Sequence, residues 1–219
     1  MSDSNNFDLI NMDLENYYSN NKLYDISKLD RDNIINSFLY KNVDLILDKI
    51  LDKINFKNPN KTISKDDIVY FDDLFKNSKN ILNNKTKEGD TLLHNMVFFG
   101  CYEIVKLLLK YGSRVDIEDV DKQIPLHRSI FLSNIKILKL LMKYSKNINT
   151  DINHKDKDGN TPLHLSILIK NYIIIENLLK YGADPYLLNN ANLVPLDLAK
   201  DKNKEFDTNV IQILKKYLK

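Results

Sequence analysis

Apolar residues in the second half of the chain recur at helical spacing, in paired segments that return at a regular interval. The longer segments read YEIVKLLLKYG, IKILKLLMKYS, YIIIENLLKYG and NVIQILKKYLK. In the first of them Ile104, Leu107, Leu108 and Tyr111 share one face and lysines lie outside it, which predicts an amphipathic helix. Each longer segment follows a shorter apolar one that opens with TLLH, IPLH, TPLH or VPLD. The fourth residues of these motifs stand at 94, 127, 164 and 197, in steps of 33, 37 and 33. The pattern predicts a helix pair repeated four times.

Turn and cap residues agree with this periodicity. Thr161 is suited to cap a helix N-terminus, and Pro162 suits the first helical position, where no backbone N–H is needed. Gly112 and Gly182 follow Lys-Tyr at helix ends, where a left-handed residue is favoured. Ser145 stands at the same position in the second repeat, so glycine there should stabilise the fold, unless the extra residues within 145–156 reroute the loop.

The motif TPLH and a period of 33 residues resemble the ankyrin repeat. The resemblance covers residues 86–219 as repeats one to four (86–118, 119–155, 156–188 and 189–219) in a domain of residues 81–219. It implies an all-α solenoid of helix-turn-helix repeats with loop or β-hairpin tips. It also implies that the motif histidine hydrogen-bonds loop backbone within and between repeats.

A metal site shared by these histidines is excluded by distance. Stacked helices lie about 8–10 Å apart, whereas zinc–nitrogen bonds are about 2.0–2.1 Å long. His94, His127 and His164 therefore cannot share one metal ion. His154 lies in the inserted loop and has no evident companion in the sequence. We expect neither a metal nor a cofactor.

The first 80 residues divide into three predicted parts. Residues 31–53 read as a helix pair without the loop motif, as an N-terminal helical cap would. Residues 54–80 read as an insertion with one short helix, capped by Ser64. Residues 1–30 carry six acids and two lysines, and form either an acidic tail or an amphipathic segment with one apolar face (Ile10, Leu14, Tyr17 and Tyr18).

Composition and motifs argue against catalysis. The net charge of +2 does not indicate a nucleic-acid or membrane surface, and no apolar run approaches the roughly 20 residues of a membrane span. Phosphate-binding loops, zinc motifs and nucleophile elbows are absent from the sequence. Cys101 reads as a small buried thiol, because the sequence supplies no nearby base. We expect an intracellular protein, in the cytoplasm or the nucleus, that binds another protein and is not an enzyme. We expect no nucleic-acid, membrane or small-molecule ligand.

Apolar pairs end the first helix of three consecutive repeats, where the resemblance implies a concave groove that is more often polar. The six residues are Phe98, Phe99, Phe131, Leu132, Leu168 and Ile169, and repeat four has Asp201 and Lys202 instead. Soluble proteins rarely leave such a strip uncovered, although part of the set could pack between helices.

The resemblance adds contacts at the hairpin tips. The tip residues are Lys87, Glu88, Asp90, Val120, Asp121, Gln123, Lys157, Asp158 and Asn160. The sequence thus predicts an adaptor or scaffold. An autoinhibited regulator and an accessory subunit of an enzyme complex are the alternatives.

Overall fold

The computed structural model describes residues 43–54, 63–147, 151–200 and 206–217, all within one compact unit, Leu39–Lys219. The regular structure of these residues is helical, as expected, and the only strand-like pairs among them are two isolated bridges. The helices are α3 (Val43–Lys53), α4 (Lys65–Asn77), α5 (Leu92–Phe98), α6 (Tyr102–Lys110), α7 (Pro125–Phe131), α8 (Ile135–Asn147), α9 (Pro162–Leu168), α10 (Tyr172–Lys180), η2 (Pro195–Ala199) and α11 (Thr208–Tyr217). The predicted segment 1–30 and residues 31–42 of the predicted cap lie outside the described residues.

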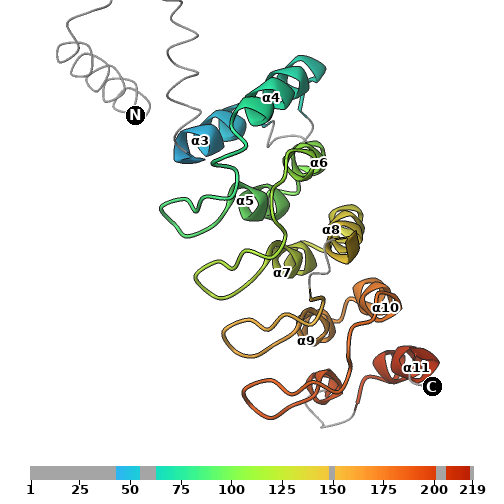
Figure 1. The fold of residues 1–219 in the computed structure, drawn as a ribbon. Coiled ribbons are helices and arrows are strands. Elements are labelled where there is room, and N and C mark those ends of the chain that lie inside the picture. Colours follow the sequence, from blue (N-terminus) through green and yellow to red (C-terminus); the bar gives the residue numbers. More distant parts are fainter. Residues whose placement is uncertain (1–42, 55–62, 148–150, 201–205, 218–219) are drawn as a thin grey trace, which may run out of the picture. The chain divides into compact units, whose positions relative to one another are not determined.

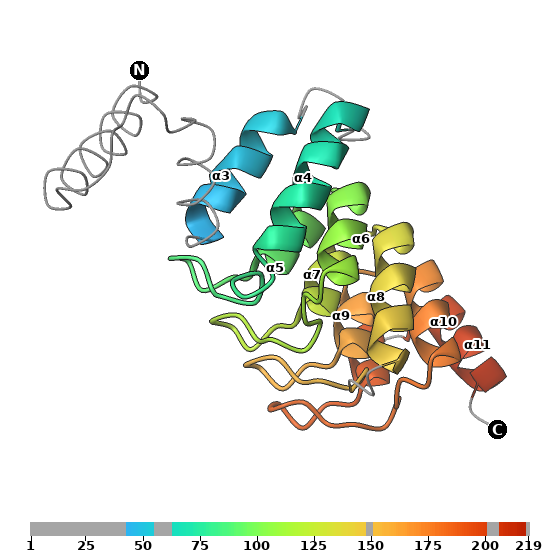
Figure 2. The same ribbon diagram turned by 45° about the horizontal axis from the view of Figure 1, so that its top comes forward.

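The helices form two rows (Figure 1). The inner row contains α5, α7, α9 and the 3₁₀ helix η2, and the outer row contains α6, α8, α10 and α11. The loops that precede the inner helices project to one side as tips, which Figure 2 shows in succession. Thr91 and Thr161 cap α5 and α9, and each accepts a hydrogen bond from the backbone N–H of the histidine three residues later.

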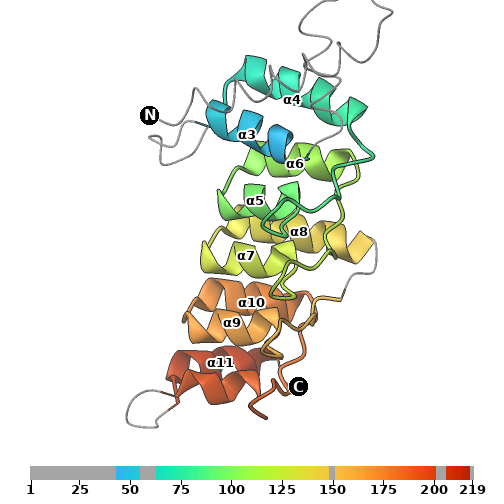
Figure 3. The same ribbon diagram turned by 90° about the vertical axis from the view of Figure 1, so that its left-hand side faces the viewer.

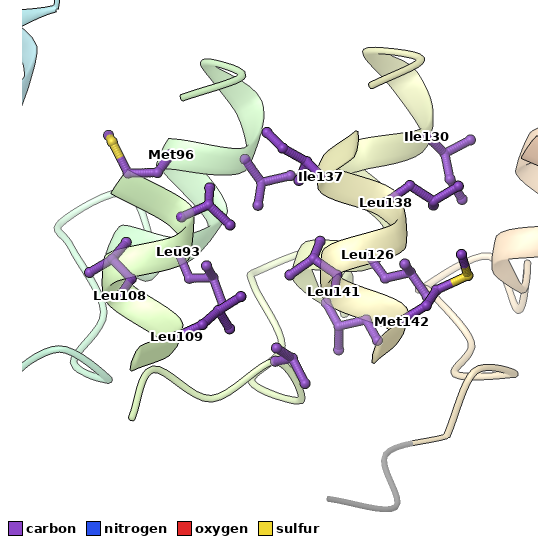
Figure 4. Packing of buried hydrophobic residues seen from close by; sticks show 14 of the residues in the cluster. Leu93, Met96, Leu108, Leu109, Leu126, Ile130, Ile137, Leu138, Leu141 and Met142 are labelled. Carbon is purple, nitrogen blue, oxygen red and sulfur yellow. The ribbon is translucent and has the colours of Figure 1, made fainter. Parts of the chain in front are cut away.

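Apolar side chains between and within the pairs form one continuous core. In Figure 4, Leu93 and Met96 of α5, with Leu108 of α6, line one pair, and Leu126 and its neighbours line the next. All of these side chains are buried. Because each helix pair buries its apolar face partly against its neighbour, the repeats depend on one another for stability.

Helices α3 and α4 extend this stack at its N-terminal side. Ser64 caps α4 as predicted, and Phe71 and Phe75 of α4 are buried in the core that α3 also joins. Lys53 of α3 forms an ion pair with Asp67 of α4 at 3.0 Å. Helix α4 packs against α6 and lies beside α3 (Figure 3), so it is the second helix of a pair. This placement differs from the expected short helix within an insertion.

The turn expected at Ser145 is absent, so the condition on which a stabilising glycine depended is not met, and the alternative in which the extra residues reroute the chain applies. Helices α6 and α10 end at Lys110 and Lys180, but α8 continues through Ser145 to Asn147. Ser145 is helical and buried. The extra residues of this repeat thus lengthen the outer helix before the chain turns. Among the described residues, the non-glycine residues with a left-handed backbone are Lys122, Ser133, Lys170 and Asn192.

Two of the motif histidines link neighbouring repeats. In His94 the ring Nδ1 accepts the backbone N–H of Thr91 at 3.3 Å, so Nε2 carries the proton and donates to the carbonyl of Gln123 at 3.0 Å. His164 forms the same bonds with Thr161 and with the carbonyl of Leu193, at 3.2 Å and 3.0 Å. Both rings are fully buried. The local bond fixes the loop, and the second bond sets the register of the next repeat.

His127 departs from this pattern. Its Nδ1 accepts the N–H of Ile124 at 3.3 Å, but its buried Nε2 has no hydrogen-bond partner among the described residues. The ring of His154 lies edge-on against it, with 6.0 Å between centroids. The Nε2 of His154 is 3.2 Å from the carbonyl of Lys122 and 3.1 Å from Glu118. His154 therefore has companions that its position in the sequence did not reveal.

Glycine should have opposite effects at Ser145 and at Lys170. Ser145→Gly should lower the free energy of unfolding by about 1 kcal/mol, because glycine weakens a helix. Lys170→Gly should raise it by about 0.5 kcal/mol, because Lys170 holds a left-handed conformation with φ 55°. Urea unfolding of both variants measures the difference, and effects of the same sign would contradict these backbone assignments.

The two linking histidines should contribute more to stability than His127. His94→Ala and His164→Ala should each cost about 1–3 kcal/mol, and His127→Ala about 1 kcal/mol less, because it loses no bond between repeats. Urea unfolding measures these costs, and metal analysis of each purified variant should show no change. Equal costs, or zinc that disappears with one substitution, would refute the assigned roles.

Stability should fall in mild acid partly through His127. Burial, helped by the nearby His154, lowers the pKa of His127 to about 4. The unfolded chain therefore binds the proton first, and stability declines as pH falls from about 6.5 to about 4. At pH 5 the free energy of unfolding should be about 2 kcal/mol lower than at neutral pH because of His127 alone.

Burial also lowers the pKa values of His94 and His164, so these residues add to the loss of stability in acid. A variant of His127 is therefore needed to isolate its contribution. Urea midpoints at pH 7.5 and pH 5.0 should differ less in His127→Gln than in the unsubstituted protein. An identical pH dependence in the two proteins would argue against a neutral buried His127.

Candidate functional site

An exposed row of large apolar side chains crosses the inner helices. Phe98 is 49% exposed, Phe131 50% and Leu168 57%, and each is the last residue of its helix. Helices α5, α7 and α9 pack in succession, so these equivalent positions follow one another across the stack. Leu132 is exposed beside Phe131. We call these four residues, Phe98, Phe131, Leu132 and Leu168, the apolar strip.

In repeats one and three the second residue of the predicted pair lies deeper. Phe99 and Ile169 are partly buried against the core, and the rings of Phe98 and Phe99 meet edge-to-face at 5.4 Å. Packing between helices thus accounts for part of the predicted set, as the alternative interpretation allowed. Asp201 and Lys202 lie outside the described residues.

Four equivalent turns build the tips beside the strip. In each, the first residue donates its backbone N–H to the carbonyl four residues later; the pairs are Thr86–Asp90, Asp119–Gln123, Asp156–Asn160 and Asn189–Leu193. In three tips a carboxylate or amide oxygen also accepts two backbone N–H groups of its own turn; these residues are Asp119, Asp156 and Asn189. The tips are therefore rigidly shaped loops.

Several predicted tip residues bind other parts of the fold. Asp121 pairs with Lys157 of the next tip at 2.8 Å, and Asp90 lies 3.2 Å from Arg128. The carbonyl of Gln123 accepts from His94, and the side-chain oxygen of Asn160 accepts from Asn189. These contacts join the tips into one row.

The remaining predicted tip residues are exposed. Lys87, Glu88 and Asp158 face solvent. Val120 is exposed as well, although its side chain closely covers Gly89 of the preceding tip.

Arg128 is a residue of this surface that the sequence analysis missed. Its guanidinium donates to Asp119 at 2.7 Å and to Asp90 at 3.2 Å, so it joins the tips of repeats one and two. The carboxylate of Asp119 is fully buried, and breaking such a pair leaves a charge without compensation. Arg128 lies one helical turn before Phe131, between the strip and the tips. It is the only lysine or arginine within α5, α7 and α9, and this could have identified it from the sequence.

The chemistry available at this surface is that of contact and hydrogen bonding. Within the described ranges, no three His, Cys, Asp or Glu side chains are grouped closely enough to hold a metal ion. Cys101 is buried, with its sulfur 3.8 Å from the carbonyl oxygen of Phe99. No helix of the described residues combines the length and apolarity needed to cross a membrane.

Comparison with known proteins identifies the repeats. No match was found among curated proteins. A family model described as ankyrin repeats in three copies matches residues 65–156 and again residues 93–189. The matches together span residues 65–189, more than half of the chain, and begin with α4. The period, the linking histidines and this match agree, and the chain belongs to the ankyrin-repeat family.

Proposed function

We propose that this protein is a non-catalytic adaptor or scaffold, in the cytoplasm or nucleus, that binds a protein partner along the apolar strip and the tips. Ankyrin repeats are generally protein–protein interaction modules. The observation that carries the proposal is that three consecutive repeats expose a large apolar side chain, Phe98, Phe131 or Leu168, at the same position. Contiguous apolar surface of this kind characterises interaction sites.

The strip is large enough to matter energetically. Full burial of a phenylalanine or leucine side chain contributes about 1.5–3 kcal/mol. Each of these three side chains is already about half covered, so a partner would gain about 1 kcal/mol from each. About 3 kcal/mol corresponds to a difference of roughly 100-fold in affinity.

The spacing of the strip favours a helix as the bound element. Neighbouring helices pack about 8–10 Å apart, so the strip offers one apolar contact at about that interval. A helix rises about 10.5 Å in seven residues, and apolar residues at every seventh position would meet each repeat once. Residues on one side of an extended strand recur at roughly 7 Å, out of step with the strip. We therefore infer that the partner presents the apolar face of an amphipathic helix.

Polar groups beside the strip would orient that helix. The exposed charged residues among the predicted contacts are Lys87, Glu88, Lys157 and Asp158, which lie on the tips of repeats one and three. Arg128 is one-quarter exposed between them. Charges of both signs along one edge favour specificity and orientation more than affinity.

Charge on the strip should abolish partner binding without unfolding the protein. Phe98→Asp with Phe131→Asp places two carboxylates in the contact surface. Val69→Asp with Ile173→Asp is the matched control, because these side chains are 70% and 60% exposed on α4 and α10, away from the strip. Affinity purification with mass spectrometry should recover the partner with the control variant and lose it with the strip variant.

Circular dichroism of both variants completes this test. Retained binding by a folded strip variant would overturn the proposed surface. An unfolded strip variant would show that Phe98 and Phe131 belong to the core.

The two alternatives from the sequence give different results in the same assay. An autoinhibited regulator would depend on residues 1–30, which lie outside the described residues. Deleting them should then strengthen partner binding, whereas an adaptor should be unaffected. If the protein is an accessory subunit of an enzyme complex, affinity purification should recover one catalytic partner in stoichiometric amount.

A further inference from the structure

The outer row carries a concentration of positive charge on α8. Lys136, Lys139 and Lys143 are exposed, and their spacing of three and four residues places them on one face. Helix α8 contains no acidic residue over its whole length. Lys106 of the neighbouring α6 is also exposed and is the equivalent of Lys139 one repeat earlier. We call Lys106, Lys136, Lys139 and Lys143 the lysine face.

Several other lysines of the outer row are paired. Lys110 of α6 meets Asp72 at 2.6 Å, and Lys180 and Lys216 meet Glu176 at 3.6 Å and 2.7 Å. In the described part of the chain, no ion pair involves a residue of the lysine face.

The acidic residues at equivalent positions of the neighbouring outer helices do not neutralise the lysine face. Glu176 is the equivalent of Lys139 in repeat three, and Lys180 and Lys216 already engage it. Glu103 is the equivalent of Lys136 in repeat one, and no ion pair between the two forms. Lysines three or four residues apart repel one another and weaken the helix. An acidic partner would relieve this repulsion.

We propose that the lysine face binds an acidic segment of a protein partner, with carboxylates at helical spacing. Nucleic-acid binding commonly uses about 6–10 phosphate contacts, more than these four lysines supply. Membrane association through α8 would need an apolar face that can insert, but Ile137, Leu138, Leu141 and Met142 are buried in the core. The lysine face lies on the outer helices and the apolar strip on the inner ones, so this contact is separate from the proposed function.

The test uses the full chain and a labelled 21-residue helical peptide with glutamates on one face. Fluorescence anisotropy at 50 mM salt should show that this peptide binds. A control peptide with glutamine in place of every glutamate should not bind. Neutralising α8 with Lys136→Gln, Lys139→Gln and Lys143→Gln should weaken binding about tenfold, as expected for three exposed ion pairs. Raising the salt to 200 mM should weaken binding by the unsubstituted protein.

A matched variant separates a local face from overall charge. Lys65→Gln, Lys85→Gln and Lys122→Gln remove the same charge from exposed lysines outside the lysine face, and should change affinity less than twofold. The α8 variant should be at least as stable as the unsubstituted protein in urea, because repulsion is removed.

Three results would overturn the proposal. These are equal weakening by both triple variants, no measurable binding of the glutamate peptide, and tighter binding of a single-stranded oligonucleotide or of phosphatidylserine vesicles through the same lysines.

Discussion

Burial of apolar surface between successive helix pairs is the constraint on which the rest of this structure depends. A single pair buries too little apolar surface to be stable alone, so each pair requires its neighbours. The core runs without interruption from Val43 of α3 to Leu214 of α11. Because stacking repeats one arrangement, a side chain at a given position in one repeat lies beside its equivalents in the next. Both proposed binding surfaces are rows of this kind, one on the inner helices and one on the outer.

The histidine bonds give the stack its register, and the insertion shows what they contribute. His94 and His164 donate to a carbonyl of the following repeat, whereas the Nε2 of His127 forms no hydrogen bond with the described residues, although the backbone of Asn160, the equivalent of Gln123, is near enough to raise the pKa of His127. The loops at the junction between repeats two and three are joined through their backbones as at the next junction, where the N–H of Asn190 donates to the carbonyl of Asp158. Lys157 pairs with Asp121, its backbone N–H donates to the Asp121 carbonyl, and His154 covers His127. At this junction the ion pair of Lys157 with Asp121 and the ring of His154 add to the backbone contact that the next junction also makes.

Much of this arrangement could be predicted from the sequence, because the period records it directly. Apolar spacing predicted the helices of the four repeats, and the motifs TLLH, IPLH, TPLH and VPLD located the starts of the inner ones. The period could not assign α4, since the link over residues 55–62 separates it from α3 and neither helix carries the motif. It also could not show that α8 passes through Ser145, because helix length depends on whether the next residues can continue the helix. The contact of His154 with His127 depends on loop geometry, which local sequence does not determine.

The candidate surface was predictable in position and less so in detail. Residues such as Phe98 and Phe99 are adjacent in sequence and equally apolar, yet the first is half exposed and the second packs against the core. A helix turns about 100° per residue, so neighbours face different surroundings. In repeats one and three the pair makes one core contact and one surface contact, whereas in repeat two both Phe131 and Leu132 are exposed.

Repeat two combines features that the other repeats have singly or not at all. Its inner helix carries Arg128 and ends in two adjacent exposed apolar residues, Phe131 and Leu132, and its outer helix bears three of the four residues of the lysine face. The core sets the position of each helix but leaves solvent-facing residues free to vary. Repeats that are equivalent in architecture can therefore differ in the chemistry of their surfaces. In this protein the differences are concentrated at repeat two.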